Sequence, residues 1–215
     1  VISTTFDKYC YISARQLPPF FDHKYRITYS KVEDIRTISE IEHPAVRAVL
    51  EERGYPDGLE IHCDADLPAR SGLGSSSSFV VGLLHSMQVL MRKSPDKRWL
   101  AEEAIRIEQE VLSEHVGSQD QIAAAYGGFN FIEFHKDKSF EVTPVNLTSH
   151  RKHELEKHLM LFFTGFSRIA SEVAKSKIAN FPIKSEQLHR MRVRVDEALA
   201  LLKSNADIRG FGEML

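Results

Sequence analysis

The chain has 215 residues, 42% of them apolar and 27% charged, with a formal net charge of −2. This composition predicts one large or two small domains with a hydrophobic core, and the near-neutral charge gives no electrostatic reason to expect a nucleic-acid partner. No apolar run approaches the roughly 20 residues that span a bilayer, and Asp7 and Lys8 interrupt the N-terminus where a signal peptide needs an apolar stretch. We therefore expect a cytoplasmic protein without a membrane partner, with Cys10 and Cys63 as buried thiols outside any CxxC spacing.

Apolar periodicity, turn residues and helix caps predict mixed α and β structure. In chain order, the expected elements are strands over 4–16 and 24–32, a helix over 44–54, a strand over 59–65, helices from the serine run to about 92, from 94 to about 112 and around 123–125, strands over 129–134, 140–144 and 159–164, and helices over most of 167–203. Pro44 suits the first turn of a helix and Gly54 its end, and Ser94 is the expected N-cap before Pro95. The charged stretch 149–156 predicts a domain junction.

The segment Pro68-Ala-Arg-Ser-Gly-Leu-Gly-Ser-Ser-Ser-Ser78 is the most informative motif. Its glycines allow positive φ and close approach of a ligand, and its serines supply hydroxyl and N–H groups where a helix begins. On composition alone, a Gly/Ser cluster is a flexible loop. Because an alternating strand precedes it and an apolar stripe at helical spacing follows, the order strand, loop, helix favours a phosphate-binding site.

Three carboxylates form the second group of candidates. Asp120, in Val116-Gly-Ser-Gln-Asp-Gln121, opens an Ala-rich helix, where it is either a helix cap or a group that orients or deprotonates a substrate hydroxyl. Glu108 and Glu110 stand two positions apart on a predicted helix, so they point to different faces. One of them can face a site while the other, like most helix glutamates, faces water.

Together these motifs resemble the GHMP small-molecule kinase superfamily, which includes galactokinase, homoserine kinase and mevalonate kinase. Other segments resemble its branch that phosphorylates D-glycero-D-manno-heptose 7-phosphate at the anomeric oxygen. These segments are Asp7-Lys-Tyr-Cys-Tyr11, Leu17-Pro-Pro-Phe-Phe-Asp-His-Lys24, Gln119-Asp-Gln121, Ala124-Ala-Tyr-Gly-Gly128 and Thr164-Gly165 before Ser167-Arg168. The resemblance covers essentially the whole chain.

The resemblance implies an α+β, two-lobed GHMP kinase fold. Residues 1–150 would form a ribosomal-protein-like N-terminal lobe that binds ATP and Mg²⁺, and residues 151–215 part of a ferredoxin-like C-terminal lobe. An N-terminal substrate loop and a C-terminal glycine-rich loop that family members carry are not found in the sequence, which implies a chain truncated at both ends. The sequence does not indicate an oligomeric state.

The resemblance also implies roles for individual residues, with ATP and Mg²⁺ as cofactors. The residues implied to wrap the ATP phosphates are Ser71, Gly72, Leu73, Gly74, Ser75, Ser76 and Ser77. Ser76 would ligate Mg²⁺, with Ser75 as the alternative, and the carboxylate ligand would be Glu110, with Glu108 as the alternative; Mg²⁺ needs few protein oxygens beside phosphates and waters. Asp120 would be the catalytic base.

The implied substrate is a small sugar phosphate, and the product would feed nucleotide-activated heptose synthesis for surface polysaccharide. A phosphorylated acceptor requires cations, and the expected contacts are Lys8, His23, Lys24 and Arg168. Three alternatives stay open: a kinase for another sugar such as fucose or galactose, a truncated non-catalytic protein that binds nucleotide or sugar phosphate, and a structural protein in which the glycine–serine loop is only a turn.

Overall fold

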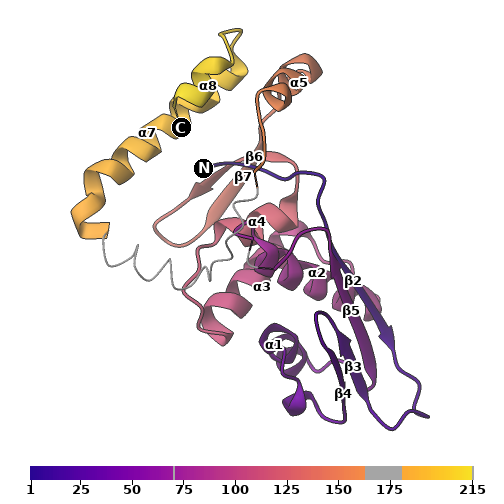
Figure 1. The fold of residues 1–215 in the computed structure, drawn as a ribbon. Coiled ribbons are helices and arrows are strands. Elements are labelled where there is room, and N and C mark those ends of the chain that lie inside the picture. The colour runs from indigo at the N-terminus through magenta and orange to yellow at the C-terminus, as the bar shows by residue number, and fades with distance from the viewer. Residues whose placement is uncertain (70, 163–180, 215) are drawn as a thin grey trace. The chain divides into compact units, whose positions relative to one another are not determined.

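The computed structural model describes residues 1–69, 71–162 and 181–214 (Figure 1). The chain divides into two compact units, each described here by itself. The large unit contains Phe6–Tyr126, and the small unit contains Val1–Thr5 together with the described parts of 127–162 and 181–214. These bounds differ from the lobes expected over 1–150 and 151–215, and the division into functional lobes stays a prediction.

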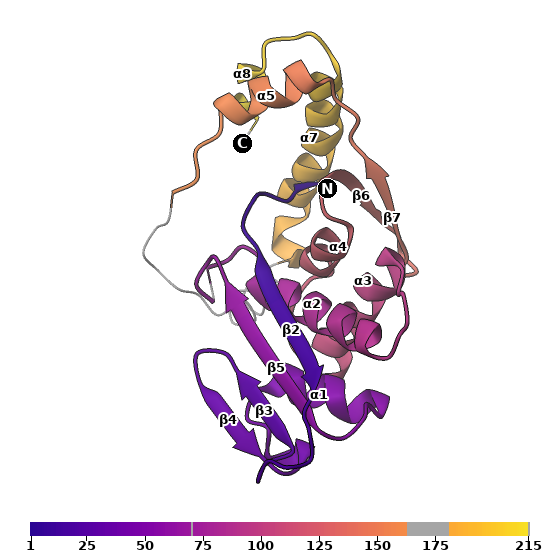
Figure 2. The same ribbon diagram turned by 90° about the vertical axis from the view of Figure 1, so that its right-hand side faces the viewer.

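The large unit is a four-stranded mixed sheet with its helices on one face (Figures 1 and 2). The strand order is β2-β5-β3-β4; β5 runs antiparallel to β2 and parallel to β3, and β3 and β4 form an antiparallel hairpin. Its elements are β2 (Cys10–Gln16), β3 (Tyr25–Thr28), β4 (Val32–Ile35), a 3-10 turn (Ile38–Glu40), α1 (Pro44–Arg53), β5 (Leu59–Ala65), α2 (Ser75–Leu90), α3 (Lys97–Arg106), a π-helical turn (Ile107–Val111) and α4 (Gln119–Tyr126).

The core of the large unit lies between the sheet and helix α2. Leu83, Leu84 and Met87 on α2 are fully buried, as the apolar stripe predicts. A Cβ at Gly82 would lie 3.0 Å from Ile12 Cγ1 on β2, so this glycine allows the helix to lie close against the strand. The packing fixes the N-terminus of α2 at the loop end of β5.

The small unit contains a three-stranded antiparallel sheet in the order β1-β6-β7. Its elements are β1 (Ile2–Thr4), β6 (Phe129–Phe134), β7 (Phe140–Pro144), α5 (Ser149–Lys157), a 3-10 turn (Phe181–Lys184), α7 (Ser185–Lys203) and α8 (Arg209–Glu213). No helix in the described ranges is long and apolar enough to cross a membrane.

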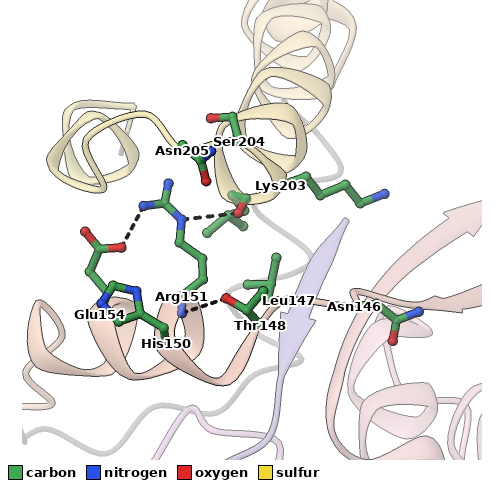
Figure 3. Close-up of a pocket in the computed structure, with 10 residues that line it drawn as sticks. Asn146, Leu147, Thr148, His150, Arg151, Glu154, Lys203, Ser204 and Asn205 are labelled. Carbon is green, nitrogen blue, oxygen red and sulfur yellow. Dashed lines mark hydrogen bonds and ion pairs between the residues drawn. The ribbon is translucent and has the colours of Figure 1, made fainter.

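Arg151 joins α5 to the C-terminal end of α7 (Figure 3). Its guanidinium donates to Leu202 O at 3.3 Å and to Leu201 O at 3.0 Å, and it pairs with Glu154 at 2.7 Å. It thereby bonds carbonyl groups in the last turn of α7, of which Leu201 O also accepts from Ser204 N at 3.1 Å. A pocket of about 380 Å³ opens beside this contact, and none of the predicted site residues that the structure describes lines it.

Several sequence predictions agree with these elements. Helix α1 begins at Pro44 and ends before Gly54, which has φ of 57°. Strands β5, β6 and β7 have the predicted bounds, and α2 begins within the serine run. In these segments the helix caps, the turn glycines and the alternation of apolar and polar residues predict the same elements.

Other predictions were wrong. The strand expected over 4–16 is two strands, β1 and β2, which pair in different sheets, and the strand expected over 24–32 covers β3 and reaches only the first residue of the hairpin partner β4. Asp96, not Ser94, caps α3: its Oδ1 accepts from Trp99 N at 2.7 Å. The stretch 149–156 is helical, as α5, and its role as a domain junction stays a prediction. Residues 159–162 are not a strand, and 163–164 lie outside the described residues.

The two cysteines are free and half-buried, not fully buried as expected. They lie on the neighbouring strands β2 and β5, with 3.9 Å between their Sγ atoms.

Candidate active site

The glycine–serine loop connects β5 to α2 through two glycines in the left-handed conformation. Gly72 has φ of 79° and Gly74 has φ of 72°, angles that glycine adopts far more readily than other residues. Gly74 is the N-cap of α2 and supplies no side-chain acceptor to the first N–H groups of the helix. Ser71 Oγ is buried and has no hydrogen-bond partner within the described chain. The loop therefore offers donors at a helix N-terminus, which suits an anion.

Glu108 lies at the opening of α2 with its carboxylate fully buried. Ser76 Oγ donates to Glu108 Oε1 at 3.2 Å, and Ser77 Oγ donates to Oε1 at 3.3 Å and to Oε2 at 3.0 Å. Burial raises the pKa of Glu108 above its ordinary value, while the hydrogen bonds from Gln121, Ser77 and Ser76 oppose that rise. The π-helical turn thus contributes one carboxylate to the loop.

The structure corrects the choice between the two glutamates. Glu110 was the expected metal ligand, but its side chain is exposed, whereas the alternative, Glu108, contacts the loop serines. Both residues lie in the π-helical turn Ile107–Val111, where two positions of separation carry the side chains to different faces. The sequence predicts that one glutamate faces the site but does not identify which, because the wider turn is not visible in the pattern.

Asp120 lies directly against Gly74. A Cβ built on Gly74 would be 3.3 Å from Asp120 Cβ and 3.5 Å from Oδ2. Asp120 is the second residue of α4, so it is in the first turn of that helix rather than at its cap. Although its side chain is open to solvent, the protein atoms around its carboxyl group displace enough water to raise its pKa. A carboxylate therefore stands beside the helix N-terminus that would receive the anion.

Gln121 is a site residue that the sequence reading did not single out. It is fully buried, and its Nε2 donates to Glu108 Oε2. Its position next to Asp120 is the one sequence signal that could have identified it. The short α4 segment thereby contacts both parts of the site.

Comparison with known proteins shows which of them the chain resembles. Residues 37–128 match the family model of the GHMP kinases N terminal domain, a range that includes the loop, Glu108 and Asp120. This range of the chain resembles the N-terminal domain of the GHMP kinases.

Two curated proteins and a solved structure resemble the chain. Over 131 residues it is 36% identical to D-glycero-alpha-D-manno-heptose 7-phosphate kinase of Campylobacter jejuni, a match that covers 61% of the chain and 39% of that protein. Over 126 residues it is 27% identical to a bifunctional fucokinase/GDP-fucose pyrophosphorylase of Arabidopsis thaliana, covering 58% of the chain and 12% of that protein. The solved structure is that of a D-glycero-D-manno-heptose 1-phosphate kinase from Bacteriodes thetaiotaomicron, with a TM-score of 0.82 and 22% sequence identity to the chain. The match covers the whole of this chain and 67% of that protein.

The comparisons confirm the predicted GHMP kinase resemblance and the α+β fold. The matches cover well under half of the two curated relatives.

The groups at the N-terminus of α2 include oxygen atoms of the kind that Mg²⁺ prefers. Octahedral Mg²⁺ with bonds of about 2.0–2.1 Å holds neighbouring oxygens about 3.0 Å apart, and Ser76 Oγ lies 3.2 Å from Glu108 Oε1. Ser76 is exposed at the loop while Glu108 lies beneath it in the core. Ser76 and Glu108 therefore fit a bound Mg²⁺ ion. Ser76 rather than Ser75 contacts the Glu108 carboxylate.

Two of the four expected acceptor contacts lie far from the glycine–serine loop. Lys24 directly precedes β3, whose first residue Tyr25 pairs with Leu59 at the start of β5 (Figure 2). The loop follows the other end of this seven-residue strand, about 20 Å away at roughly 3.3 Å per residue. Lys24 pairs with Asp57 at 3.2 Å, and its neighbour His23 lies 3.6 Å from Asp34. The strand therefore separates these two residues from the loop, and their role as acceptor contacts stays a prediction.

The other two expected contacts also remain predictions. Lys8 is exposed, and the neighbouring Tyr9 N donates to Asp66 Oδ2 at 2.8 Å, so this segment runs beside the start of the loop. Arg168 lies outside the described residues.

Proposed function

We propose that this protein is a kinase that transfers the γ-phosphoryl group of ATP to a hydroxyl group of a sugar phosphate. The observation that carries the proposal is the meeting of three groups at the N-terminus of α2. These groups are the glycine loop, the Ser76–Glu108 pair at 3.2 Å, and Asp120 against Gly74. A phosphate-binding loop, a metal-ligating pair and a carboxylate base are the parts that phosphoryl transfer needs.

In the proposed reaction, the loop from Ser71 to Ser77 binds the ATP phosphates through backbone N–H groups and hydroxyls. Ser76 and Glu108 would hold Mg²⁺, which neutralises charge on the phosphates when bound. Asp120 accepts the proton of the acceptor hydroxyl as its oxygen bonds to the γ-phosphorus, while the bond from that phosphorus to the bridging oxygen breaks and ADP leaves. Positioning and charge neutralisation supply most of the rate.

The proposed acceptor is D-glycero-D-manno-heptose 7-phosphate, phosphorylated at its anomeric hydroxyl. Its support is the 36% identity to the heptose 7-phosphate kinase of Campylobacter jejuni, together with the fold shared with a heptose kinase from Bacteriodes thetaiotaomicron. Use of ATP and a sugar phosphate makes the cytoplasm the proposed site of the reaction.

A second candidate is a kinase of another sugar, which the similarity to the fucokinase protein favours. ADP release measured with ATP, Mg²⁺ and a panel of heptose 7-phosphate, fucose and galactose separates the two. We expect ADP release only in the reaction that contains heptose 7-phosphate, and none with fucose or galactose. Turnover with a simple hexose and none with heptose 7-phosphate would refute the acceptor, and the absence of turnover with every sugar would refute the kinase.

A third candidate is a protein that binds the nucleotide without catalysis. It predicts that ATP raises the melting temperature, because a ligand at about one hundred times its Kd adds roughly 2.7 kcal/mol, while ADP is never released. The retention of Ser76, Glu108 and Asp120 at one helix N-terminus favours the kinase, since a binding protein needs no base.

A further inference from the structure

The stability of the fold does not explain why a polar side chain is buried at Gln121. The residue is fully buried, and its Oε1 has no hydrogen-bond partner within the described part of the chain. A buried polar atom without a partner costs stability, so an apolar side chain of the same size would stabilise this position better. The other end of the amide gives a reason for its presence, because Nε2 donates to Glu108 Oε2.

The hydrogen bonds around Glu108 make its two oxygens different. Oε2 accepts from Gln121 Nε2 and, at 3.0 Å, from Ser77 Oγ. Oε1 accepts from Ser76 Oγ at 3.2 Å and takes the longer of the two Ser77 contacts, at 3.3 Å. Rotation of the carboxylate would therefore give up the Gln121 bond inside the protein interior, where a lost hydrogen bond is costly.

We propose that Gln121 is a positioning residue for the metal-binding carboxylate of this site, a role that rests on the proposed function. By occupying Oε2, it holds Glu108 with Oε1 toward the Ser76 hydroxyl. The Glu108 carboxylate is therefore already oriented for the metal ion before the ion binds. Residues that orient a ligating carboxylate typically change metal affinity or activity by 10–100-fold when replaced.

The position of Gln121 also couples two functions of α4. The residue directly follows Asp120, which lies against Gly74 at the N-terminus of α2. One short helix thus orients the metal-binding carboxylate through Gln121 and carries the proposed base through Asp120. A change at Gln121 should affect metal binding while the carboxyl group of Asp120 stays in place.

The test replaces Gln121 with methionine, which has nearly the same length and volume but no N–H donor. The measurement is the Kd of Mn²⁺, read by electron paramagnetic resonance with saturating ADP, so that it does not depend on turnover. We expect Q121M to weaken Mn²⁺ binding by about 10–100-fold and to raise the KM for the metal–ATP complex more than it lowers kcat at saturating metal. Should Q121M fail to fold, Gln121→Asn, whose shorter amide cannot reach the carboxylate as well, should shift the Mn²⁺ Kd in the same direction.

A matched control is Gln88→Met on α2. Gln88 is also buried, and its Nε2 donates to the Tyr55 hydroxyl at 3.3 Å, within the unit but not to any loop serine or to Glu108. Q88M removes one buried amide hydrogen bond as Q121M does, so we expect it to lower the free energy of unfolding and leave the Mn²⁺ Kd unchanged.

The outcomes separate this inference from the proposed function. An unchanged Mn²⁺ Kd in Q121M, or an equal loss in Q88M, would overturn the positioning role even if the wild type is an active kinase. A selective loss in Q121M beside a wild type that transfers no phosphoryl group would support the positioning role and refute the kinase. A wild type that binds no Mn²⁺ with ADP would overturn both.

Discussion

Gly74 and Asp120 are in direct contact across the start of α2: a Cβ on Gly74 would lie 3.3 Å from the Cβ of Asp120. The glycine has φ of 72°, so its backbone is also in a conformation that a side chain resists. The loop that would bind phosphate and the carboxylate that would act on the acceptor are therefore positioned by one close approach.

Gly74→Ala should reduce both stability and phosphoryl transfer. The left-handed conformation costs a residue with a Cβ about 1–2 kcal/mol, and the added methyl group would also displace Asp120. Urea unfolding and ADP release measure the two effects. Gly54→Ala is the control, because Gly54 has φ of 57° at the end of α1 and an added Cβ would meet nothing within 4 Å. We expect G54A to lose similar stability and retain full activity, and comparable activity in G74A and wild type would contradict the account.

Asp120→Asn should abolish most activity without destabilising the protein. Loss of the base is expected to slow turnover by about 100- to 10,000-fold. Loss of water around the carboxyl raises the pKa of Asp120, so the folded state binds its proton more tightly than the unfolded state does. The ionised group therefore lowers stability above the unfolded pKa of about 3.9, and this cost is absent in acid. Urea unfolding should find D120N at least as stable as wild type at neutral pH, with the difference vanishing at about pH 3; a D120N protein that unfolds far more easily would indicate a structural role.

Glu108→Gln and Glu110→Gln form a pair that tests which glutamate binds the metal. Glu108 is buried beside Ser76, whereas Glu110 is exposed. Loss of the charged ligand should lower kcat by roughly 100- to 1000-fold, and the exposed substitution should change stability by less than about 0.5 kcal/mol and leave activity intact. Steady-state rates over a range of Mg²⁺ concentrations measure both. If E110Q were the inactive variant, the original sequence prediction would be right and the assignment from the structure wrong.

His43 should make the protein less stable in mild acid. The centroid of its ring lies 4.7 Å from that of Phe79 and 4.9 Å from that of Tyr29. Burial of the ring lowers the pKa of His43, and the nearby charge of Glu33 opposes that shift. The folded state therefore resists protonation, so stability is lost as pH falls below the unfolded value of about 6.5. His43→Asn keeps an N-cap acceptor for α1 but removes the titrating group. Free energies of unfolding measured between about pH 7 and pH 5 should fall more steeply for wild type, and parallel curves would contradict this.

The parts of the fold that the sequence predicted are those determined locally. Helix α1 has Pro44 in its first turn and a left-handed Gly54 after its end, and the glycine–serine loop lies between a strand and a helix as expected. Each of these signals acts within a few residues. They are readable without any tertiary information.

The other parts of the fold depend on strand pairing between residues far apart in the sequence, which local sequence signals do not predict. The first strand is divided because Ile2 pairs with Phe131 in one sheet while Ile12 pairs with Cys63 in another. His23 and Lys24 resembled site residues through their charge, but only the register of β3 on β5 reveals their distance from the loop.

The sequence proposed the loop serines and Asp120 as site residues, and the structure brings them together at the N-terminus of α2. The π-helical turn decides that Glu108 rather than Glu110 contacts Ser76. Gln121 lies in a segment that carries the family resemblance but received no role of its own, because glutamine in a short helix is an ordinary surface residue and only its complete burial distinguishes it.

The central claim is that the groups around the N-terminus of α2 are the active site of a sugar-phosphate kinase. It is tested most directly by ³¹P NMR of a reaction containing ATP, Mg²⁺ and D-glycero-D-manno-heptose 7-phosphate, run with wild type and with D120N. The account predicts that wild type converts ATP to ADP with the appearance of a second phosphate ester on the anomeric carbon of the heptose, and that D120N forms it at least about 100-fold more slowly. Unchanged ATP with wild type, or equal product formation by D120N, would contradict the account.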